Sequence, residues 1–390
     1  MKKILFVTYD FPFPTTSGGK SRAYHMMKFG GKELELHLFS FVRSDFKEEY
    51  KSELEKIGIK KITTVFRKKL MRPGNIKTLF SKSHSIFYYL YFDKKIKEQL
   101  VNYVKTNKID IVHFESFYTG FYISDTLSKL GVRQIFGTEN IEYSIYKDYV
   151  AQKAPIFIKP LFAKEALKIQ SEEERMIRLS DMTLAVTNND LDVIKRINES
   201  CEIVENGVDI NQFIYGVPEK IDRTKLLFVG NFSYFPNVDA IQFFYKEIFV
   251  NLPEKFTLTI IGKKVNTLGI KDSRVSLIEF VPDIGTAYST ADIFISPIRI
   301  GGGTNFKILE AMAMGLPVIA HSARVKDLGA VSGRELLTAE KAPAFIEQIE
   351  LLSKDYVLSL SISKSAREFI EKRYAWDIIG KKLNTLWKNL

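Results

Sequence analysis

A lysine and a glutamate three positions apart follow a run of three glycines in the second half of the chain. The glycines, Gly301–Gly303, let the backbone approach a ligand closely because no side chain stands in the way. A helix predicted to begin near Thr304 points its unpaired N–H groups and the positive end of its dipole into the same space, which favours phosphate. Lys307 and Glu310 share one face of that helix. The lysine can therefore pair with phosphate oxygens, and the glutamate can accept hydrogen bonds from a ribose diol.

A second group of polar residues follows predicted strands of the first half. His113 and Glu115 end one strand and, at a period of two, face the same side. Gly18 and Gly19 lie in a loop after the first strand, and Arg22 could add positive charge there. Two alternatives remain open: His113 as a buried histidine with satisfied hydrogen bonds, and Arg22 as a solvated residue beside a turn.

Short apolar runs rich in β-branched and aromatic residues must position these side chains. In the first half they predict strands at Lys3–Thr8, Leu36–Phe41, Ile62–Phe66, Ile109–Phe114, Arg133–Phe136 and Met182–Val186. In the second half they predict strands at Lys225–Val229, Thr257–Ile261, Ser276–Phe280, Ile293–Ser296 and Pro317–Ala320. Unbroken apolar strands alternating with helices are typical of parallel sheets covered on both faces. The two series predict an α/β protein of two doubly wound, Rossmann-like domains.

The length of 390 residues suits two domains. We expect a first domain over 1–205, a second over 206–373, and a C-terminal helix over 374–390. That helix carries large apolar side chains at helical spacing, which favours packing over ligand contact: Trp376, Ile379, Leu383 and Trp387.

The net charge of +11 is concentrated, since residues 51–100 hold 13 basic and 4 acidic residues. A concentrated basic zone indicates an anionic partner or a solvated basic face. Basic residues beside aromatics over 66–92 favour docking on an anionic membrane surface rather than on nucleic acid, with a core helix as the alternative. The single cysteine, Cys201, suits a reducing compartment. We therefore expect a cytoplasmic protein, peripheral on the inner face of the cell membrane.

The stretch Ser296–Ala320 resembles the retaining glycosyltransferases of family 4 (group 1), in the bacterial subgroup with a triple glycine, Thr, Lys and Leu-Glu-Ala. Further stretches match the family in its order: Asn206–Asp209, Phe228–Asn231 with Pro236–Ala240, Val281–Ile284, Tyr288–Phe294 and Ala375–Asp377. The resemblance implies the GT-B fold, in which two Rossmann-like domains face a cleft and the C-terminal helix crosses back to the first domain.

The resemblance also implies an activity. It is transfer of a sugar, with retained anomeric configuration, from a nucleotide diphosphate sugar (UDP- or GDP-linked) to a hydroxyl of a glycan or polyprenyl-linked acceptor in surface polysaccharide synthesis. Such enzymes need neither a cofactor nor a metal, and the five histidines show no paired metal-ligand spacing. The implied donor-binding residues are Gly18, Gly19, Arg22, Gly230, Asn231, Lys263, Arg299, Gly301, Gly302, Gly303, Thr304 and Asn305. The implied catalytic residues are Lys307, Glu310, Glu115 and His113, and the implied acceptor-side residues are Glu139 and Asn140.

Three positions depart from the family pattern. Gly302 stands where the wider family has Glu, as in the subgroup, while Asn231 and Asn305 stand where arginines contact the diphosphate. Lys307 is then the best remaining cation, with Arg299 and Lys263 in reserve. Two alternatives follow: a nucleotide-sugar-binding subunit without turnover, and a sugar epimerase or phosphorylase on the same fold.

Overall fold

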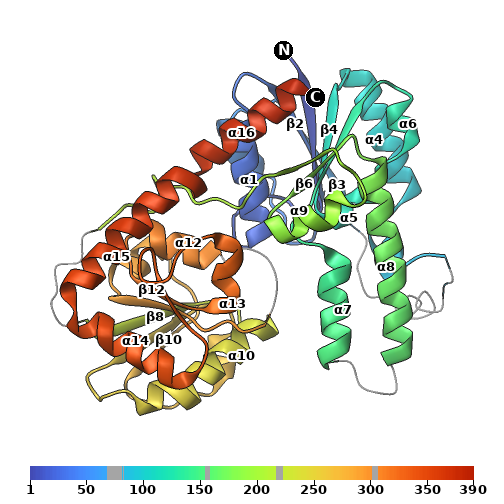
Figure 1. Ribbon diagram of the computed structural model, residues 1–390. Coiled ribbons are helices and arrows are strands. Elements are labelled where there is room, and N and C mark those ends of the chain that lie inside the picture. Colours follow the sequence, from blue (N-terminus) through green and yellow to red (C-terminus); the bar gives the residue numbers. More distant parts are fainter. Residues whose placement is uncertain (68–80, 82, 154–158, 217–222, 301–305) are drawn as a thin grey trace. The chain divides into compact units, whose positions relative to one another are not determined.

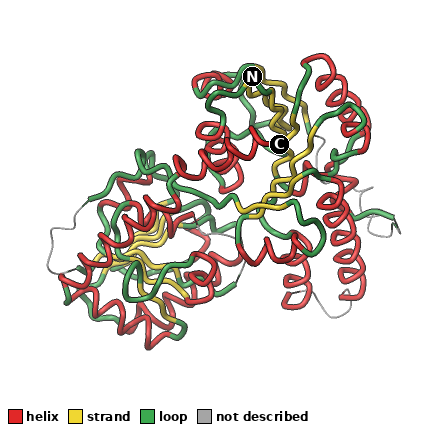
Figure 2. The backbone as a smooth tube through the Cα atoms, turned by 45° about the horizontal axis from the view of Figure 1, so that its top comes forward, coloured by secondary structure: helices red, strands yellow, loops and turns green. Residues whose placement is uncertain are grey.

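The structure is a computed structural model of the 390-residue chain, and it describes residues 1–67, 81, 83–153, 159–216, 223–300 and 306–390. The chain divides into two compact units (Figure 1). The first comprises Met1–Glu205 together with Ile379–Leu390, and the second comprises Asn206–Ile378. Figure 2 shows the strands of each unit gathered into a sheet with helices around it.

The first unit is built on a seven-stranded sheet in the order β3-β2-β1-β4-β5-β6-β7, with all neighbouring strands parallel. Its strands are β1 (Lys3–Thr8), β2 (Glu35–Val42), β3 (Lys61–Phe66), β4 (Ile111–Glu115), β5 (Arg133–Gly137), β6 (Met182–Ala185) and β7 (Cys201–Ile203). The strand order reverses between β1 and β4, where doubly wound sheets bind ligands at the carboxyl ends of their strands.

Helices cover both faces of this sheet. They are α1 (Gly18–Gly30), α2 (Tyr50–Lys56), α3 (Ile86–Tyr91), α4 (Lys94–Asn107), α5 (Phe117–Gly120), α6 (Asp125–Ser128), α7 (Glu142–Lys153), α8 (Lys159–Leu179) and α9 (Asn188–Lys195). One core cluster joins Val112 and Phe136 of the sheet to Leu100 of α4 and Met176 of α8. The helices α7 and α8 pack side by side and extend beyond the sheet (Figure 1).

The second unit is built on a six-stranded parallel sheet in the order β10-β9-β8-β11-β12-β13. Its strands are β8 (Lys225–Val229), β9 (Thr257–Ile261), β10 (Val275–Ile278), β11 (Ile293–Ser296), β12 (Val318–His321) and β13 (Leu337–Ala339). Alternate residues of β8 serve two cores, because Leu226 packs in the cluster that contains Phe345 and Leu227 packs in the cluster that contains Met312.

The helical elements of this unit are α10 (Phe235–Phe243), α11 (Ile284–Ser289), α12 (Phe306–Ala313), α13 (Ser322–Val325), α14 (Ala342–Lys354) and α15 (Tyr356–Phe369). Shorter or irregular turns complete it: η2 (Phe244–Ile248), η3 (Phe249–Asn251), η4 (Val265–Leu268), η5 (Lys326–Leu328) and η6 (Ile370–Tyr374). The link from β9 to β10 contains only η4, whereas most other strand connections contain an α-helix.

The last helix, α16 (Trp376–Asn389), ends in the first unit. Trp387 and Leu383 are fully buried there and lie against Gly30, where an added Cβ would come within 2.9 Å of the indole. Asn384 Nδ2 donates to the Gly30 carbonyl at 2.7 Å. The prediction that the aromatic side chains of this helix pack in a core is confirmed.

All eleven predicted strands are present, with ends shifted by at most two residues. The prediction missed β7 and β13, which are edge strands of three residues each. The predicted strand Ser276–Phe280 is shorter in the structure, since β10 ends at Ile278 and the Phe280 side chain is 78% exposed.

Candidate functional site

Lys307 lies on the first turn of α12, half-buried in the second unit. Its Nζ donates to Asn237 Oδ1 at 2.8 Å and lies 4.9 Å from the centre of the Phe228 ring. Desolvation lowers the pKa of Lys307 to about 7, although the nearby Glu310 carboxylate opposes this shift. An anion bound beside this amine would raise its pKa and keep it protonated.

Glu310 lies on the same face of α12, as the three-residue spacing predicts. The buried Tyr288 of α11 donates its hydroxyl to Glu310 Oε2 at 2.8 Å. Desolvation raises the pKa of Glu310, while the Tyr288 hydrogen bond and the Lys307 charge oppose that rise. Tyr288 therefore occupies one carboxylate oxygen of Glu310 and fixes the orientation of the other.

Asn237 joins Lys307 to the loop that follows β8. Its Nδ2 donates to the Asn231 carbonyl at 2.9 Å, and an added Cβ on Gly230 would lie 3.0 Å from Asn237 Cγ. Gly230 and Asn231, both predicted to bind the donor, are thus held at the carboxyl end of β8 beside Lys307. The Asn231 side chain accepts a hydrogen bond from the Ser233 backbone at 2.9 Å, so its oxygen shapes the loop.

The two reserve cations have different surroundings. The Arg299 guanidinium pairs with both carboxylate oxygens of Asp239 at 3.1 Å and lies 4.3 Å from the Phe243 ring centre. Lys263 follows β9 on the surface, and among the described residues its ammonium has no partner. Of these two reserve cations, Lys263 is therefore the one whose charge remains available to a diphosphate. The remaining predicted donor residues, Gly301, Gly302, Gly303, Thr304 and Asn305, lie outside the described residues.

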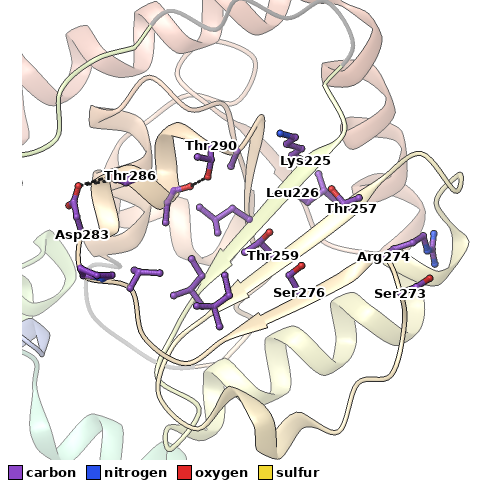
Figure 3. A pocket seen from close by; sticks show the side chains of 17 residues that line it. Lys225, Leu226, Thr257, Thr259, Ser273, Arg274, Ser276, Asp283, Thr286 and Thr290 are labelled. Atoms are coloured by element: carbon purple, nitrogen blue, oxygen red, sulfur yellow. Dashed lines mark hydrogen bonds between the residues drawn. The ribbon is translucent and has the colours of Figure 1, made fainter.

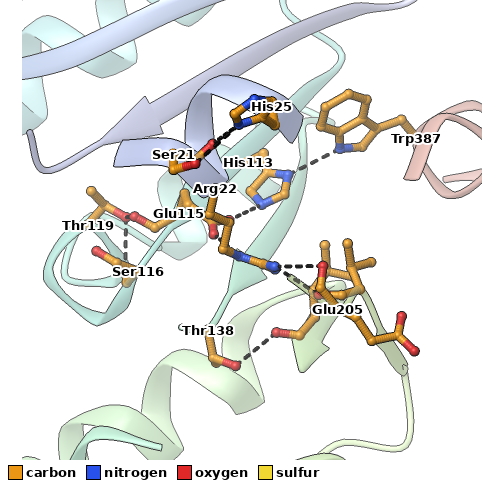
Figure 4. A network of polar contacts seen from close by, with 12 residues as sticks. Ser21, Arg22, His25, His113, Glu115, Ser116, Thr119, Thr138, Glu205 and Trp387 are labelled. Carbon is orange, nitrogen blue, oxygen red and sulfur yellow. Dashed lines mark hydrogen bonds and ion pairs between the residues drawn. The ribbon is translucent and has the colours of Figure 1, made fainter. Parts of the chain in front are cut away.

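In the first unit, Arg22, Glu115, His113 and Trp387 form one buried network (Figure 4). Arg22 Nε donates to Glu115 Oε1 at 2.7 Å, and its Nη1 donates to the Val204 carbonyl at 2.9 Å. His113 Nε2 bonds Glu115 Oε2 at 2.9 Å, and Trp387 Nε1 donates to His113 Nδ1 at 3.1 Å. Because an indole N–H only donates, the His113 proton sits on Nε2.

Burial and the bonds of this network shift the pKa values of Glu115 and His113. Burial alone would raise the pKa of Glu115, but the charge of Arg22 and the bond from His113 hold it below the usual range. Burial lowers the pKa of His113. Arg22, His113 and Glu115 are each at most 1% exposed and bonded within the first unit, and their contact with a substrate stays a prediction.

Gly19 and Glu139 lie beside Glu115 at a small cavity of about 10 Å³ at the carboxyl ends of β1 and β4. An added Cβ on Gly19 would come within 2.6 Å of Glu139 Oε1, so a larger residue would require the Glu139 carboxyl to move. Within the described part of the chain, Glu139 Oε1 and Asn140 Oδ1 are buried without a hydrogen-bond partner. Burial, followed by the Glu115 charge, raises the pKa of Glu139 to about 8. Gly18 begins α1 at the same place.

The model of the family "Glycosyl transferases group 1" matches residues 223–355. That range contains Asn237, Tyr288, Lys307 and Glu310. We refer to residues 223–355, which are similar to this family, as the group 1 domain.

Relatives over the full length share this architecture. An uncharacterized 44.6 kDa protein in the cps region of Klebsiella pneumoniae is 23% identical, covering 96% of this chain and 97% of its own. The crystal structure of Anabaena HepE in complex with UDP and glucose has a TM-score of 0.69 at 14% identity and covers 100% of both chains. WaaG, a glycosyltransferase involved in lipopolysaccharide biosynthesis, has a TM-score of 0.63 at 13% identity, covering 98% of this chain and 99% of its own. The protein has the GT-B fold.

Sequence reasoning missed two residues of the group 1 domain. Asn237 and Tyr288 lie in the stretches Pro236–Ala240 and Tyr288–Phe294, which carry the family resemblance, yet no role was assigned to either. Their side chains bond Lys307 and Glu310 from 70 and 22 residues away along the chain. The available signal was a polar side chain inside an apolar helix, which needs a partner when it is buried.

The group 1 domain also has a cavity of about 650 Å³ on the face of β8, β9 and β10 (Figure 3). Its Arg274 pairs with Asp272 at 3.1 Å, and its Asp283 caps α11 by accepting from the Gly285 and Thr286 backbones. The cavity lies between these strands and α11, whose Ala287 lines it, and neither Lys307 nor Glu310 contributes to it.

The basic zone of the first unit is only partly described. The Arg67 guanidinium lies 4.7 Å from the centre of the Tyr91 ring, while residues 68–80 and 82 lie outside the described residues. The aromatic side chains of α3 pack on the unit, as Phe87 does against Phe117 and Tyr118. Tyr89, 42% exposed, is the large exposed apolar residue of this helix. These aromatic side chains contact neighbouring rings, and docking on a membrane stays a prediction.

In the regions that the structure describes, no group of three or more His, Cys, Asp or Glu side chains is placed to hold a metal ion. No helix within the described ranges is long and apolar enough to cross a bilayer.

Proposed function

We propose that the protein transfers a sugar from a nucleotide diphosphate sugar to a hydroxyl of a glycan or lipid-linked acceptor, with retention of configuration. The observation that carries this proposal is the Lys307–Glu310 pair on one face of α12, each held by a buried polar partner. This pair lies within the group 1 domain.

In the proposed complex, the diphosphate lies against Lys307 and the glycine loop before α12. Negative charge grows on the diphosphate as its bond to the sugar carbon breaks, so a nearby cation stabilises the transition state. The acceptor oxygen forms the new bond to that carbon, and its proton passes to a departing phosphate oxygen. Glu310 accepts the ribose hydroxyls with the oxygen that Tyr288 leaves unoccupied. Neither a cofactor nor a metal takes part.

Relatives guide the choice of substrates. HepE has been crystallised with UDP and glucose, which makes UDP-sugars the first donors to test and GDP-sugars the second. The involvement of WaaG in lipopolysaccharide biosynthesis and the cps-region relative favour an acceptor from surface polysaccharide synthesis.

One observation favours a second candidate, a nucleotide-sugar-binding subunit without turnover. The Arg299 charge is neutralised by Asp239, and asparagine stands at position 231 where the wider family has arginine. Fewer cations would then face the leaving diphosphate.

The test combines binding with turnover. Thermal unfolding with UDP-, GDP- and ADP-sugars should show a higher midpoint with one donor, since a ligand that binds only the native state stabilises it. Slow hydrolysis of that donor, with release of the nucleoside diphosphate, would support the transferase. Tight binding with no hydrolysis and no transfer to lipid-linked extracts would favour the subunit, and no shift with any nucleotide would exclude both.

A further inference from the structure

The first unit contains a second cavity, of about 220 Å³, between α3, α4 and α8. It is separate from the group 1 domain, and no role for it follows from the proposed donor site. Its lining residues combine aromatic rings, two cations and one carboxylate: His84, Tyr88, Phe92, Lys97, Phe121, Glu172, Arg175 and Met176.

Aromatic rings form a continuous stack along one side of this cavity. The His84 and Tyr88 rings stack at 3.8 Å with an interplanar angle of 12°, and the Tyr88 and Phe92 rings stack at 4.8 Å and 18°. Phe121 meets Tyr88 edge-on at 5.6 Å. Such rings offer a flat apolar surface of fixed geometry. A sugar ring, whose C–H face is apolar, fits such a surface.

Two cations line the same cavity without carboxylate partners. On α8, Arg178 pairs with Glu174 at 3.3 Å and Lys168 pairs with Glu165. By contrast, neither Arg175 nor Lys97 has a side-chain partner among the residues described in the structure. Two cations that line one cavity and make no ion pair with a described residue favour an anion there.

Glu172 supplies an acceptor to the same space. Its Oε1 accepts from the Ser85 backbone at 2.9 Å and bonds His84 Nδ1 at 3.3 Å. Its Oε2 is buried and, in the described part of the molecule, has no hydrogen-bond partner. A buried carboxylate oxygen without a donor is costly, so a hydroxyl group supplied by a ligand would stabilise it.

We propose that this cavity binds an acidic sugar. Its carboxylate or phosphate lies between Lys97 and Arg175, its apolar ring face lies on Tyr88 and Phe92, and one hydroxyl donates to Glu172 Oε2. A simple anion would not need the aromatic stack or the carboxylate, and a neutral sugar would not need two cations. Binding of the acidic sugar to this cavity is independent of the proposed function. Its identity as part of the acceptor rests on the proposed function.

The test measures binding of four probes to the full chain by titration calorimetry or ligand-observed NMR: methyl glucuronide, glucose 1-phosphate, neutral methyl glucoside and inorganic phosphate. We expect the two acidic sugars to bind at least about tenfold more tightly than the other two probes. The double variant Lys97→Gln/Arg175→Gln should lose at least about tenfold of that affinity, as the loss of a charge-assisted bond predicts. Its control, Lys95→Gln/Arg178→Gln, removes the same charge from the same two helices outside the cavity and should keep it.

Several results would overturn the proposal. These are equal binding of methyl glucoside, equal binding of inorganic phosphate, an equal loss in the control variant, and no binding of either acidic sugar. UDP affinity, measured on the same samples, separates the two proposals. Intact UDP binding with no acidic-sugar binding contradicts only the cavity, whereas acidic-sugar binding without any nucleotide binding contradicts only the proposed donor site.

Discussion

Lys307 combines a half-buried ammonium with a pKa of about 7, so its charge changes near neutral pH. An anionic donor binds the protonated form better. Affinity for a nucleoside diphosphate should therefore fall as pH rises above about 7, because binding then has to take up a proton.

Calorimetry of UDP binding between pH 6 and 9 checks this prediction, in wild type and in Lys307→Ala. Any pH dependence of UDP affinity that both proteins show comes from ionisation of the nucleotide itself. The additional pH dependence of affinity in wild type should vanish in Lys307→Ala. It should persist in Lys263→Ala, which removes the exposed lysine. A wild-type profile parallel to that of Lys307→Ala would show that Lys307 does not contact the diphosphate.

Glu310 is predicted to read the ribose diol. Glu310→Gln should weaken UDP binding by about 1.5–3 kcal/mol, the cost of losing a hydrogen bond to a charged group. Binding of 2′-deoxy-UDP, which lacks one hydroxyl, should change less, so the variant should discriminate less between the two nucleotides. Equal losses for both would place Glu310 elsewhere, provided that thermal unfolding shows the variant to be folded.

For single residues, the sequence indicates candidate ligand contacts more readily than it predicts which side chains bond to one another. Glycines, a lysine and a glutamate at fixed spacing indicate phosphate and ribose contacts. The bond from Asn237 to Lys307 spans 70 residues and the Arg22–Glu115 ion pair spans 93, and local spacing contains no information about such pairs. Glu115 and His113 were therefore predicted to face a ligand, whereas the structure shows both bonded to other residues of the first unit.

Among the elements, α8 stabilises the starts of two other helices through buried carboxylates. Glu173 accepts from the Glu142 and Tyr143 backbones at 2.9 and 3.0 Å, and these N–H groups belong to the first turn of α7. Glu165 accepts from the Ile86 backbone at the start of α3. These carboxyl oxygens accept from N–H groups that have no partner within their own helices, and they fix α3 and α7 to α8.

Glu173 predicts a pH dependence of stability. Burial raises its pKa to about 8 despite the two backbone bonds. The folded state therefore binds more protons than the unfolded state between about pH 4.5 and 8, and this residue's contribution to stability falls as pH rises through that window.

In urea unfolding at pH 5, 6, 7 and 8, the difference in stability between wild type and Glu173→Gln should shift towards the variant as pH rises. Glu174→Gln, one residue further along α8, should show no such shift. A pH-independent difference for Glu173→Gln would contradict the prediction.

The basic zone between β3 and α3 predicts electrostatic docking on anionic lipid. Each basic residue near such a surface contributes about 1 kcal/mol, and salt screens the attraction over about 8 Å at physiological ionic strength. Flotation with anionic liposomes should fall with salt and fall further when Lys68, Lys69, Arg72 and Lys77 are changed to Ser. Equal flotation on neutral liposomes, or an unaffected variant, would remove the membrane role.

Strands were predictable because they are short runs dominated by apolar and β-branched residues, as in β1 (Lys3–Thr8) and β11 (Ile293–Ser296). The edge strands β7 (Cys201–Ile203) and β13 (Leu337–Ala339) were not, since three residues cannot establish a periodic pattern. The packing of α3 was also not predictable, because aromatic residues next to lysines are typical of both membrane contacts and core helices.

For the whole molecule, the C-terminal helix is part of the first unit's core. Trp387→Ala should lower the stability of that unit by about 3–5 kcal/mol, the usual cost of truncating a buried aromatic residue. Hydrogen exchange should become faster in α1 and β4, which contain Gly30 and His113. Ile378→Ala, on the same helix but 44% exposed, should have little effect. Equal protection in both variants would contradict a structural role for the indole.

The doubly wound pattern follows from the order of strands and glycine turns along the sequence, whereas the GT-B fold was implied by the family resemblance. The pairing of the last residues with His113 and Gly30 does not, because apolar spacing identifies a helix face without identifying the surface that it covers. Amphipathic helices are common to many folds.

Because the C-terminal helix completes the core of the first unit, that core cannot be completed until the end of synthesis. When the first 205 residues leave the ribosome, His113 lacks its indole partner, and the surface around Gly30 that Leu383 covers is open to water. Domains generally fold in the order in which they emerge, yet here the whole second unit leaves the ribosome before Trp387 does. The domain that begins first is therefore finished last, and a nascent chain interrupted near its end leaves an incomplete N-terminal core.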